Sequence, residues 1–385
     1  MADPLAWIDD EVDRLKESHL YREFVTRESP PVAGMVQLDG NQFINFGSND
    51  YLGIAASEEL VLAVQNSVSQ VGVGSGASPL INGRGTLHRR LEHELAAFEG
   101  TESTLLFPTG YAANVGAICS LVGAGDVVFS DSLNHASIVD GCRLSGAKIV
   151  VYPHSNVSKL NELINSATGF KRRLIVSDGL FSMDGDFADV PSLCEIADQH
   201  DAMLMIDEAH ATGTVGENGK GCCEYFGVDG RVDIVVGTLS KALGCQGGFV
   251  AGRENLIRYL FNKARTQIFS TAQPEAISAA ALAALEIVRN QPQRREKLKE
   301  KSAVVRDQLA AAGLDIGTTQ SHIIPVILGS NQIVLEQAKQ LKKSGIFVPA
   351  IRPPSVAENA SRLRVCLTST HNAEQLDKLM KCLIR

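Results

Sequence analysis

The sequence predicts an α/β fold, in which a large domain with a mostly parallel central sheet is joined to a smaller α+β domain at the C-terminal end. Between residues 104 and 238, short apolar runs such as DVVF, RLIV and MLMI alternate with segments of helical periodicity. Unalternating runs are typical of strands covered on both faces, and their alternation with helices predicts a parallel sheet. After about residue 280 the pattern changes to one long charged helix and then to short strands and helices. We therefore expect a helix and hairpin arm over 1–49, a large domain over 50–285 and a small domain over 286–385.

The composition is typical of a cytoplasmic enzyme. The chain has 385 residues, of which 44% are hydrophobic, and can bury a large core. Its 44 acidic and 36 basic residues give a net charge of −8 without any basic run, so we expect no nucleic-acid partner and no membrane partner. Eight scattered cysteines without paired CxxC motifs favour reduced thiols and no metal site. The acidic, amphipathic N-terminus resembles neither a signal peptide nor a transit peptide.

The first hundred residues predict a helix, a hairpin and a second helix. Ile8, Val12 and Leu15 share one face of the N-terminal helix. The segment MVQLDGNQFIN alternates around Asp-Gly, the signal of a two-residue hairpin, and Asn49 lies in the polar turn that follows. The chain has neither a strand followed by GxGxxG, nor the spacing of a P-loop, nor a GxSxG elbow. The sequence therefore disfavours nucleotide binding and serine hydrolysis as functions.

Polar residues follow several predicted strands of the large domain. Thr109, Gly110 and Tyr111 lie at a strand-to-helix junction, where free N–H groups and the helix dipole suit a phosphate. His135 follows the strand DVVFSD, and Ser182 follows RLIVSD in the loop LFSMDGD. Each of these residues alone fits an ordinary turn or a structural role about as well as a functional one.

The segment over 203–250 carries the most specific pattern. Its first strand, MLMI, delivers Asp207 to the edge where α/β sheets bind ligands, and His210 follows one turn later. Its second strand, DIVVGT, leads through Thr238 to Lys241 and the glycine-rich segment GCQGG. Pyridoxal 5′-phosphate (PLP) needs a buried carboxylate that keeps its ring nitrogen protonated and a lysine amine that carries it as a Schiff base. Asp207 alone could cap a loop and Lys241 alone could be a surface lysine, but the combination predicts a PLP site in which Thr238 could hold phosphate.

Three arginines near the C-terminus are candidates for binding a carboxylate. Arg362 and Arg364 share one face of the predicted strand RLRVCLTST. Arg352 precedes two prolines in IRPPSV, which requires extended backbone there. An arginine in such a place can grip a carboxylate with two parallel hydrogen bonds. The alternative is that these arginines are solvated charges on an edge strand.

Together these motifs identify the chain as a member of the α-oxoamine synthases, which are PLP enzymes of the aspartate aminotransferase-like fold, or fold type I. The resemblance extends from about residue 43 to the C-terminus. It is carried by NFGSNDYLG, GSGAS, TGYAANVG, LNHASIVDG, GLFSMDGD, IDEAHATGTVGENGKG, GTLSKALG, STAQP and AIRPPSV with RLRVCLT. The segment SPLINGRG departs from the family in its proline, and the N-terminal arm aligns poorly.

The resemblance implies a role for each candidate residue. Lys241 would be the Schiff-base lysine and proton shuttle, and Asp207 the partner of the pyridinium nitrogen. His135 would stack on the ring and touch the amino acid, while His210 and Ser182 would bond the phenolate oxygen. The phosphate contacts would be Gly110, Tyr111 and Thr238, with Ser270 and Thr271 added across a dimer interface. The substrate contacts would be Arg364 for the amino-acid carboxylate, Asn49, Arg352 and Ser355 along the substrate site, and Arg22 for the acyl substrate.

The implied reaction is the decarboxylative condensation of L-alanine with a pimeloyl thioester in biotin biosynthesis, giving 8-amino-7-oxononanoate, CO2 and the free thiol. The thioester would be pimeloyl-CoA or pimeloyl-carrier protein, which share the reacting carbon. The motif IRPPSV favours this reaction over the condensation of glycine with acetyl-CoA by a related member of the family. A non-catalytic partner subunit is a further alternative. The presence of both Lys241 and Asp207 argues against it. The resemblance also implies a homodimer with shared active sites.

Overall fold

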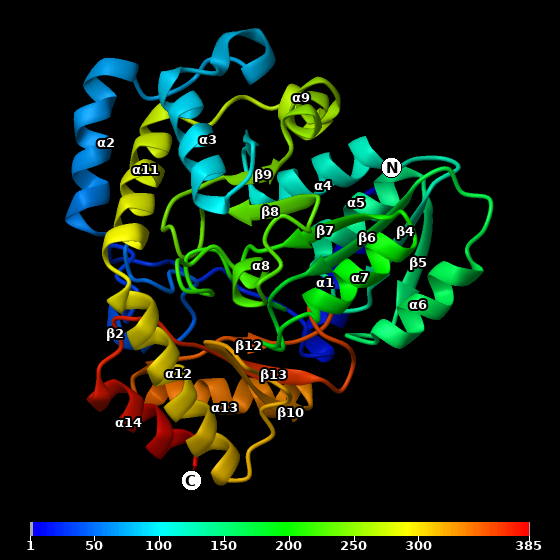
Figure 1. Cartoon of the computed structure of the whole chain (residues 1–385). Helices are drawn as coiled ribbons and strands as arrows, with labels where there is room; N and C mark the ends of the chain where they lie inside the picture. The colour runs from blue at the N-terminus through cyan, green and yellow to red at the C-terminus, as the bar shows by residue number, and fades with distance from the viewer. Residues whose placement is uncertain (1–2, 385) are drawn as a thin grey trace. The chain divides into compact units, whose positions relative to one another are not determined.

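The computed structural model of the chain describes residues 3–384, which form two compact units (Figure 1). The larger unit comprises residues 50–182 and 186–297, and the smaller unit takes the chain up to residue 49, residues 183–185 and the segment from 298 onward. The smaller unit is therefore built from both ends of the chain together with a three-residue piece of one loop. The three-part division expected from the sequence, with boundaries after residues 49 and 285, stays a prediction.

A seven-stranded sheet forms the centre of the larger unit, in the order β3-β9-β8-β7-β6-β4-β5. Its strands are β3 (Ser103–Phe107), β4 (Val127–Asp131), β5 (Lys148–Tyr152), β6 (Arg173–Asp178), β7 (Met203–Asp207), β8 (Ile234–Thr238) and β9 (Gly248–Gly252). β9 runs antiparallel to both neighbours, and the other neighbouring pairs are parallel. The mostly parallel sheet predicted from the apolar runs is thus confirmed. The strand β9, with the sequence GFVAG, is one that the apolar pattern does not predict.

Helices cover both faces of this sheet (Figure 1). Along β4, β6 and β7 the side chains alternate between two hydrophobic cores, so that Leu204 and Ile206 of β7 belong to one core and Met205 to the other. The first core includes side chains of α6 (Val157–Ser166) and α7 (Val190–Gln199), and the second those of α4 (Gly110–Leu121), α5 (Ala136–Ser145) and α9 (Glu254–Lys263). Full burial of one such strand side chain stabilises the fold by about 1.5–3 kcal/mol. The remaining helices are α2 (Glu58–Val71), α3 (Thr86–Glu99), α8 (Cys222–Tyr225), α10 (Arg265–Ile268), α11 (Glu275–Asn290) and a π-helix over Pro79–Gly83.

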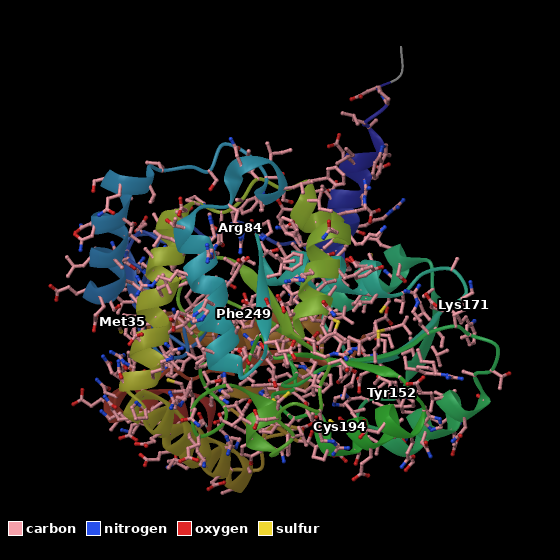
Figure 2. All side chains as sticks on the ribbon, turned by 45° about the horizontal axis from the view of Figure 1, so that its top comes forward. Met35, Arg84, Tyr152, Lys171, Cys194 and Phe249 are labelled. Atoms are coloured by element: carbon pink, nitrogen blue, oxygen red, sulfur yellow. The ribbon has the colours of Figure 1, made fainter. Side chains whose placement is uncertain are left out.

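Two glycines allow β9 to lie against β8 and against the first residues of α4. Phe249 on β9 is fully buried (Figure 2), and a Cβ atom added to Gly237 on β8 would lie 2.2 Å from its ring. A Cβ atom added to Gly248 would lie 2.5 Å from the backbone nitrogen of Gly110. Real Cβ atoms do not approach other atoms so closely, so both positions require glycine. The N-terminus of α4 is consequently held against the start of β9.

The smaller unit contains two three-stranded sheets, ordered β1-β2-β11 and β10-β13-β12. Its elements are α1 (Trp7–Glu17), β1 (Met35–Leu38), β2 (Asn41–Asn45), β10 (Ile323–Gly329), α13 (Asn331–Lys343), β11 (Ile346–Phe347), β12 (Ala350–Ile351), β13 (Ser361–Cys366) and α14 (Ala373–Leu383), while α12 (Gln293–Ala311) contains the last unit boundary. The predicted hairpin is present, and Asp39 and Gly40 both adopt positive φ in its two-residue turn. Within residues 3–384, no helix combines the length and the apolar character needed to cross a membrane.

Candidate active site

A cavity of about 180 Å³ lies at the carboxyl ends of the parallel strands of the larger unit. Because β6, β7 and β8 are parallel, Asp178, Asp207 and Thr238 reach the same edge of the sheet. The cavity is lined by Thr109, Gly110, Tyr111, Asn114, His135, Ser137, Asp178, Asp207, Ala209, His210, Thr238, Ser240 and Lys241. Seven of the sequence-predicted site residues are among them: Gly110, Tyr111, His135, Asp207, His210, Thr238 and Lys241.

The carboxylate of Asp207 is buried and held at both oxygens. Its Oδ2 accepts a hydrogen bond from Asn114 Nδ2 at 2.6 Å, and its Oδ1 accepts one from the backbone N–H of Ala209 at 2.8 Å. The same Asn114 amide donates to Ser137 Oγ at 2.9 Å, which joins α4 to α5 behind the carboxylate. Asn114 was not among the predicted site residues, although a polar residue in the apolar start of the helix TGYAANVG is a usable signal.

His135 precedes α5 as its N-cap residue. Its backbone N–H donates to Asp178 Oδ2 at 2.8 Å, and its Nδ1 lies 2.7 Å from Ser137 Oγ. Burial lowers the pKa of the His135 imidazole, which leaves the ring neutral near pH 7. Burial and the neighbouring charge of Asp207 raise the pKa of Asp178 well above its ordinary value. The loop therefore presents a fixed, uncharged aromatic ring to the cavity.

His210 is oriented by Tyr51, a residue 159 positions earlier in the sequence. The Tyr51 hydroxyl lies 2.7 Å from His210 Nδ1, and the tyrosine side chain is fully buried. This contact fixes the orientation of the His210 imidazole at the wall of the cavity. Sequence analysis named Asn49 in the turn NFGSNDYLG but not Tyr51 two residues later.

The N-terminus of α4 meets the end of β8 at the wall of the cavity. Thr109 caps the helix, its side chain accepting from the N–H of Ala112 at 3.0 Å. Thr238 Oγ1 donates to the carbonyl of Gly247 at 2.8 Å and lies 2.8 Å from Ser240 Oγ. Because the first N–H groups of a helix have no carbonyl partner within it, this corner is suited to a phosphate.

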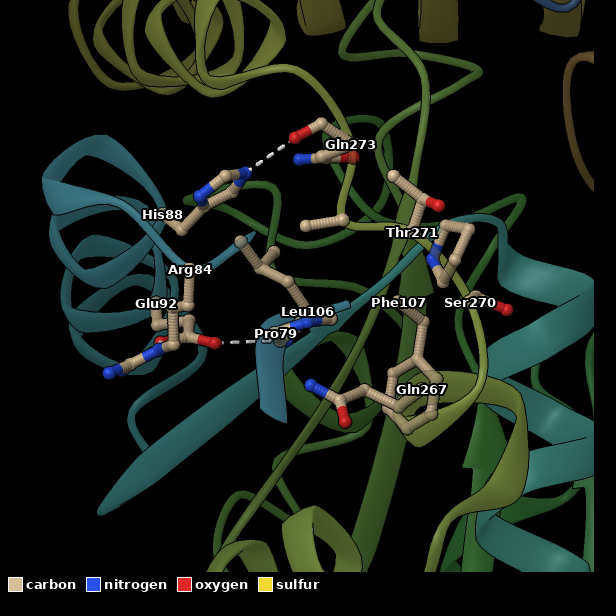
Figure 3. Close-up of a pocket in the computed structure, with 12 residues that line it drawn as sticks. Pro79, Arg84, His88, Glu92, Leu106, Phe107, Gln267, Ser270, Thr271 and Gln273 are labelled. Carbon is tan, nitrogen blue, oxygen red and sulfur yellow. Dashed lines mark hydrogen bonds and ion pairs between the residues drawn. The ribbon is translucent and has the colours of Figure 1, made fainter. Parts of the chain in front are cut away.

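Ser182, Ser270 and Thr271 are not among the residues that line this cavity. Ser182 is buried in the loop that follows β6. Ser270 and Thr271 line a second, smaller cavity of about 20 Å³ (Figure 3). There His88 Nε2 lies 2.7 Å from the carbonyl oxygen of Gln273, as the dashed line in Figure 3 shows. The two predicted phosphate contacts of the STAQP motif thus line a different cavity from Gly110, Tyr111 and Thr238.

The predicted substrate residues Arg22, Asn49, Arg352, Ser355 and Arg364 all belong to the smaller unit. Arg364 Nη1 donates to Asn49 Oδ1 at 3.1 Å. Arg362 forms an ion pair with Asp184 at 2.6 Å. Both arginines are buried, and β13 is the central strand of its sheet, so the alternative of solvated edge-strand charges is wrong.

Arg22 and Arg352 connect the N-terminal arm to the segment IRPPSV. Arg22 Nη2 donates to the carbonyl of Pro353 at 2.8 Å, and Arg352 Nη1 donates to the carbonyl of His19. Ser355 closes the turn through its N–H, which donates to the carbonyl of Arg352 at 3.1 Å. Burial and the charge of Arg22 lower the pKa of Arg352. Two guanidinium groups that bind backbone carbonyls and repel each other are suited to an anionic ligand.

The cavity of the larger unit fits a flat pyridine cofactor that carries a phosphate. It combines a buried carboxylate, a neutral imidazole, a lysine amine and a helix N-terminus within one enclosure. The donor set contains no arrangement suited to a metal, and within residues 3–384 no cluster of three or more His, Cys, Asp or Glu side chains has metal-binding geometry.

Residues 41–383 match the family described as aminotransferase class I and II. The chain therefore belongs to this family, and the resemblance to the α-oxoamine synthases within it is confirmed by its relatives. The 8-amino-7-oxononanoate synthase of Anaeromyxobacter dehalogenans is 46% identical over 379 residues, covering 98% of this chain and 95% of the relative. The 8-amino-7-oxononanoate synthase 2 of Bacillus subtilis is 42% identical over 376 residues, covering 98% and 96%.

Solved structures show the same fold. Serine palmitoyltransferase of Sphingomonas wittichii superposes with a TM-score of 0.93 at 30% identity, covering 100% of this chain and 98% of that one. A structure of SPT with a PLP internal aldimine gives a TM-score of 0.94 at 29% identity, with 100% and 98% coverage. The 8-amino-7-oxononanoate synthase of Francisella tularensis gives 0.78 at 28% identity, with 89% and 97% coverage. The expected aspartate aminotransferase-like fold is thus confirmed.

Proposed function

We propose that the chain is a PLP-dependent 8-amino-7-oxononanoate synthase of biotin biosynthesis. It condenses L-alanine with a pimeloyl thioester, and the products are 8-amino-7-oxononanoate, CO2 and the free thiol. One observation carries the proposal: Lys241 and Asp207 share a cavity with the N-terminus of α4, in a chain 46% identical to a synthase of that name over nearly its full length. The bond that forms joins the alanine Cα to the acyl carbon, and the bonds that break release the thiol and the alanine carboxylate.

The residues around the cofactor divide the work. When bound, PLP supplies an electron sink for the negative charge that develops on the alanine Cα. Lys241 holds the cofactor covalently and then, as a free amine, takes the α-proton. Asp207, fixed by Asn114, keeps the proton on the ring nitrogen. The neutral ring of His135, which lines the cavity, would stack on the pyridine and could donate a hydrogen bond to the thioester carbonyl.

The remaining cavity residues hold the edges of the cofactor. Gly110, Tyr111 and Thr238 bind the phosphate at the start of α4. His210, oriented by Tyr51, would donate to the phenolate oxygen, and Ser182, which does not line the cavity in this structure, would join it there from the loop after β6. In the smaller unit, Arg364 with Asn49 binds the alanine carboxylate, and the acyl substrate is bound by Arg22, Arg352 and Ser355.

We propose further that the enzyme is a cytoplasmic homodimer with shared active sites. Ser270 and Thr271 line a cavity separate from the phosphate corner of their own chain, which supports a contact to the phosphate of a partner subunit. Ile81 is 74% exposed and Phe269 is 71% exposed. Large apolar side chains that open to water support a protein partner that covers them.

A product assay with alternative substrates tests the function. The purified protein with PLP is given L-alanine, glycine or L-serine, each with pimeloyl-CoA, pimeloyl-carrier protein or acetyl-CoA, and products are identified by mass. We expect 8-amino-7-oxononanoate from L-alanine with a pimeloyl donor as the dominant product. Faster turnover of glycine with acetyl-CoA would assign the chain to the other branch of the family, and no turnover of any pair would support a non-catalytic subunit.

A further inference from the structure

His154 lies between two carboxylates just after the edge strand β5. Its Nδ1 lies 3.0 Å from Asp131 Oδ1, and its Nε2 lies 2.8 Å from Asp186 Oδ2. Carboxylates only accept hydrogen bonds, so both ring nitrogens must donate, which requires the doubly protonated imidazolium. The side chains of Asp131 and Asp186 are 2% and 9% exposed, and that of His154 is 23% exposed. A partly buried positive charge is therefore placed between two buried negative charges.

The partner Asp186 closes the turn that carries Ser182. The carbonyl of Asp186 accepts from the N–H of Phe181 at 3.0 Å, and Leu180 pairs with Phe187 in an antiparallel bridge. The rings of Phe181 and His154 pack in a T-shaped arrangement, with an interplanar angle of 86° and 4.4 Å between ring centroids. His154 thus contacts the residues on both sides of the turn, one through a charged hydrogen bond and one through ring packing.

The partner Asp131 belongs to the loop that leads to His135. It ends β4, and its carboxylate also accepts from the N–H of Leu133 at 2.8 Å and from the N–H of Ser155 at 2.8 Å. Both carboxylate oxygens of Asp131 therefore accept hydrogen bonds from the loops at this edge of the sheet. The imidazolium joins the loop before His135 to the loop that carries Ser182, two loops that are separate in the sequence.

We propose that His154 is a positioning residue, which holds the turn of Ser182 in the orientation that a hydrogen bond to the cofactor requires. The inference rests on the proposed function, because the contact of Ser182 with the cofactor is part of that proposal. His154 itself does not line the cavity and takes no part in the chemistry. Its effect on cofactor binding passes through Ser182, and this distinguishes it from a residue that only stabilises the fold.

A double-mutant cycle on PLP affinity tests this route. PLP is titrated into the apo forms of the parent, Ser182→Ala, His154→Gln and the double variant, and the dissociation constant is read from the absorbance of the bound cofactor. Loss of one hydrogen bond should raise the dissociation constant about two- to ten-fold in Ser182→Ala. His154→Gln should raise it to a similar extent, and the double variant should bind no more weakly than Ser182→Ala. Independent, multiplicative effects of the two substitutions would overturn the proposal.

Two further variants keep the test interpretable. Asp186→Asn preserves size while removing the acceptor charge, and it replaces His154→Gln in the cycle if the latter does not fold. His200→Gln is the matched control, because His200 is a half-buried histidine of the same unit that bonds Asn161 Oδ1 at 3.1 Å, away from both loops. We expect parental affinity from it. Unchanged affinity in Ser182→Ala would overturn the positioning role while leaving the proposed function standing, whereas failure of the parent to bind PLP would overturn the proposed function itself.

Discussion

At the scale of single residues, Lys241 has the sharpest chemical task, since it supplies both the covalent attachment and the base. Lys241→Ala should abolish product formation, because neither task can be performed by a methyl group. The fold should persist, since the side chain contributes more chemistry than packing. Mass detection of product and a thermal melt followed by circular dichroism measure the two effects. Lys171→Ala, which removes an exposed lysine of the same unit (Figure 2), should retain parental turnover, and residual turnover in the Lys241 variant at that level would remove the lysine from the mechanism.

Arg364 is expected to recognise the alanine carboxylate through its planar fork. Arg364→Lys should weaken L-alanine binding roughly ten- to a hundred-fold, because an ammonium cannot make two parallel hydrogen bonds. PLP affinity should not change, since the cofactor contacts lie in the other unit. Titration with L-alanine, followed by the absorbance of the bound cofactor, measures the effect. Equal alanine affinity in the variant and the parent would contradict the assignment.

The neighbouring arginine is unsuitable as a control for that experiment. Arg362 is buried and paired with Asp184, so its substitution would disturb a buried ion pair. Arg14→Lys is the better control, since the Arg14 side chain is 73% exposed on α1 and pairs only with Glu11 on the same helix. We expect this variant to bind L-alanine as the parent does.

Residue identity was predictable where a polar residue follows a strand, and unpredictable where a partner comes from far along the chain. Asp207 and Lys241 follow apolar strands, so position and chemistry coincide in the sequence. Tyr51 orients His210 across 159 positions, and no local pattern records that contact. The burial of Arg362 could not be predicted from the sequence either, because its partner Asp184 lies in a loop 178 positions away.

At the scale of elements, Gly248 on β9 sets the position of the first residues of α4, where we propose that the phosphate binds. Gly248→Ala should destabilise the protein by about 1–3 kcal/mol, because the added methyl would force the start of α4 away from β9. The same displacement should weaken PLP binding. Denaturant unfolding and PLP titration measure the two effects. Gly123→Ala is the control, since its Cβ would meet only the carbonyl oxygen of Ser145 at an ordinary 3.6 Å. Parental PLP affinity in Gly248→Ala would show that cofactor binding does not depend on the close contact between β9 and the start of α4.

The bridge between the loops after β4 and β6 should make stability depend on pH. Burial alone would lower the pKa of His154, but hydrogen bonds to Asp131 and Asp186 raise it to about 10. A folded pKa above the unfolded value of about 6.5 gives stabilisation that is complete below that value and is lost as the pH rises toward 10. The difference in melting temperature between the parent and His154→Gln should therefore shrink from pH 7 to pH 10. A difference that stays constant across this range would contradict an imidazolium between these two carboxylates.

The elements themselves were well predicted where apolar runs are continuous. The strands β4, β6, β7 and β8 coincide with the apolar runs DVVF, RLIV, MLMI and DIVV. Parallel strands that are buried on both faces have no polar alternation, so such runs predict them. The strand β9 was missed because GFVAG offers few side chains to an apolar pattern. Its place in the sheet depends on close backbone approach to β8 and α4, which no pattern of hydrophobicity encodes.

At the scale of the whole molecule, the proposed dimer can be tested by complementation. Lys241→Ala lacks the covalent attachment, and the double variant Ser270→Ala, Thr271→Ala lacks the phosphate contacts proposed to cross the interface. In a mixed dimer, one site would combine an intact Lys241 with intact Ser270 and Thr271. Co-expression of the two variants should therefore produce a set of sites with parental PLP affinity, which neither variant shows alone. Absence of such sites in a purified mixed dimer would confine each active site to one chain.

The pairing of β2 with β11 has a consequence for the time at which the protein can fold during its synthesis. Ile44 pairs with Ile346, and Asn45 with Phe347, so about 300 residues must be added before the N-terminal hairpin finds its third strand. At 5–20 residues per second the ribosome needs about 15–60 s for this distance. Throughout that interval the edge of β2 that later pairs with β11 has no strand partner, while the larger unit is already being completed. The hairpin of β1 and β2 thus leaves the ribosome long before β11, and it is among the last parts of the smaller unit to complete its pairing.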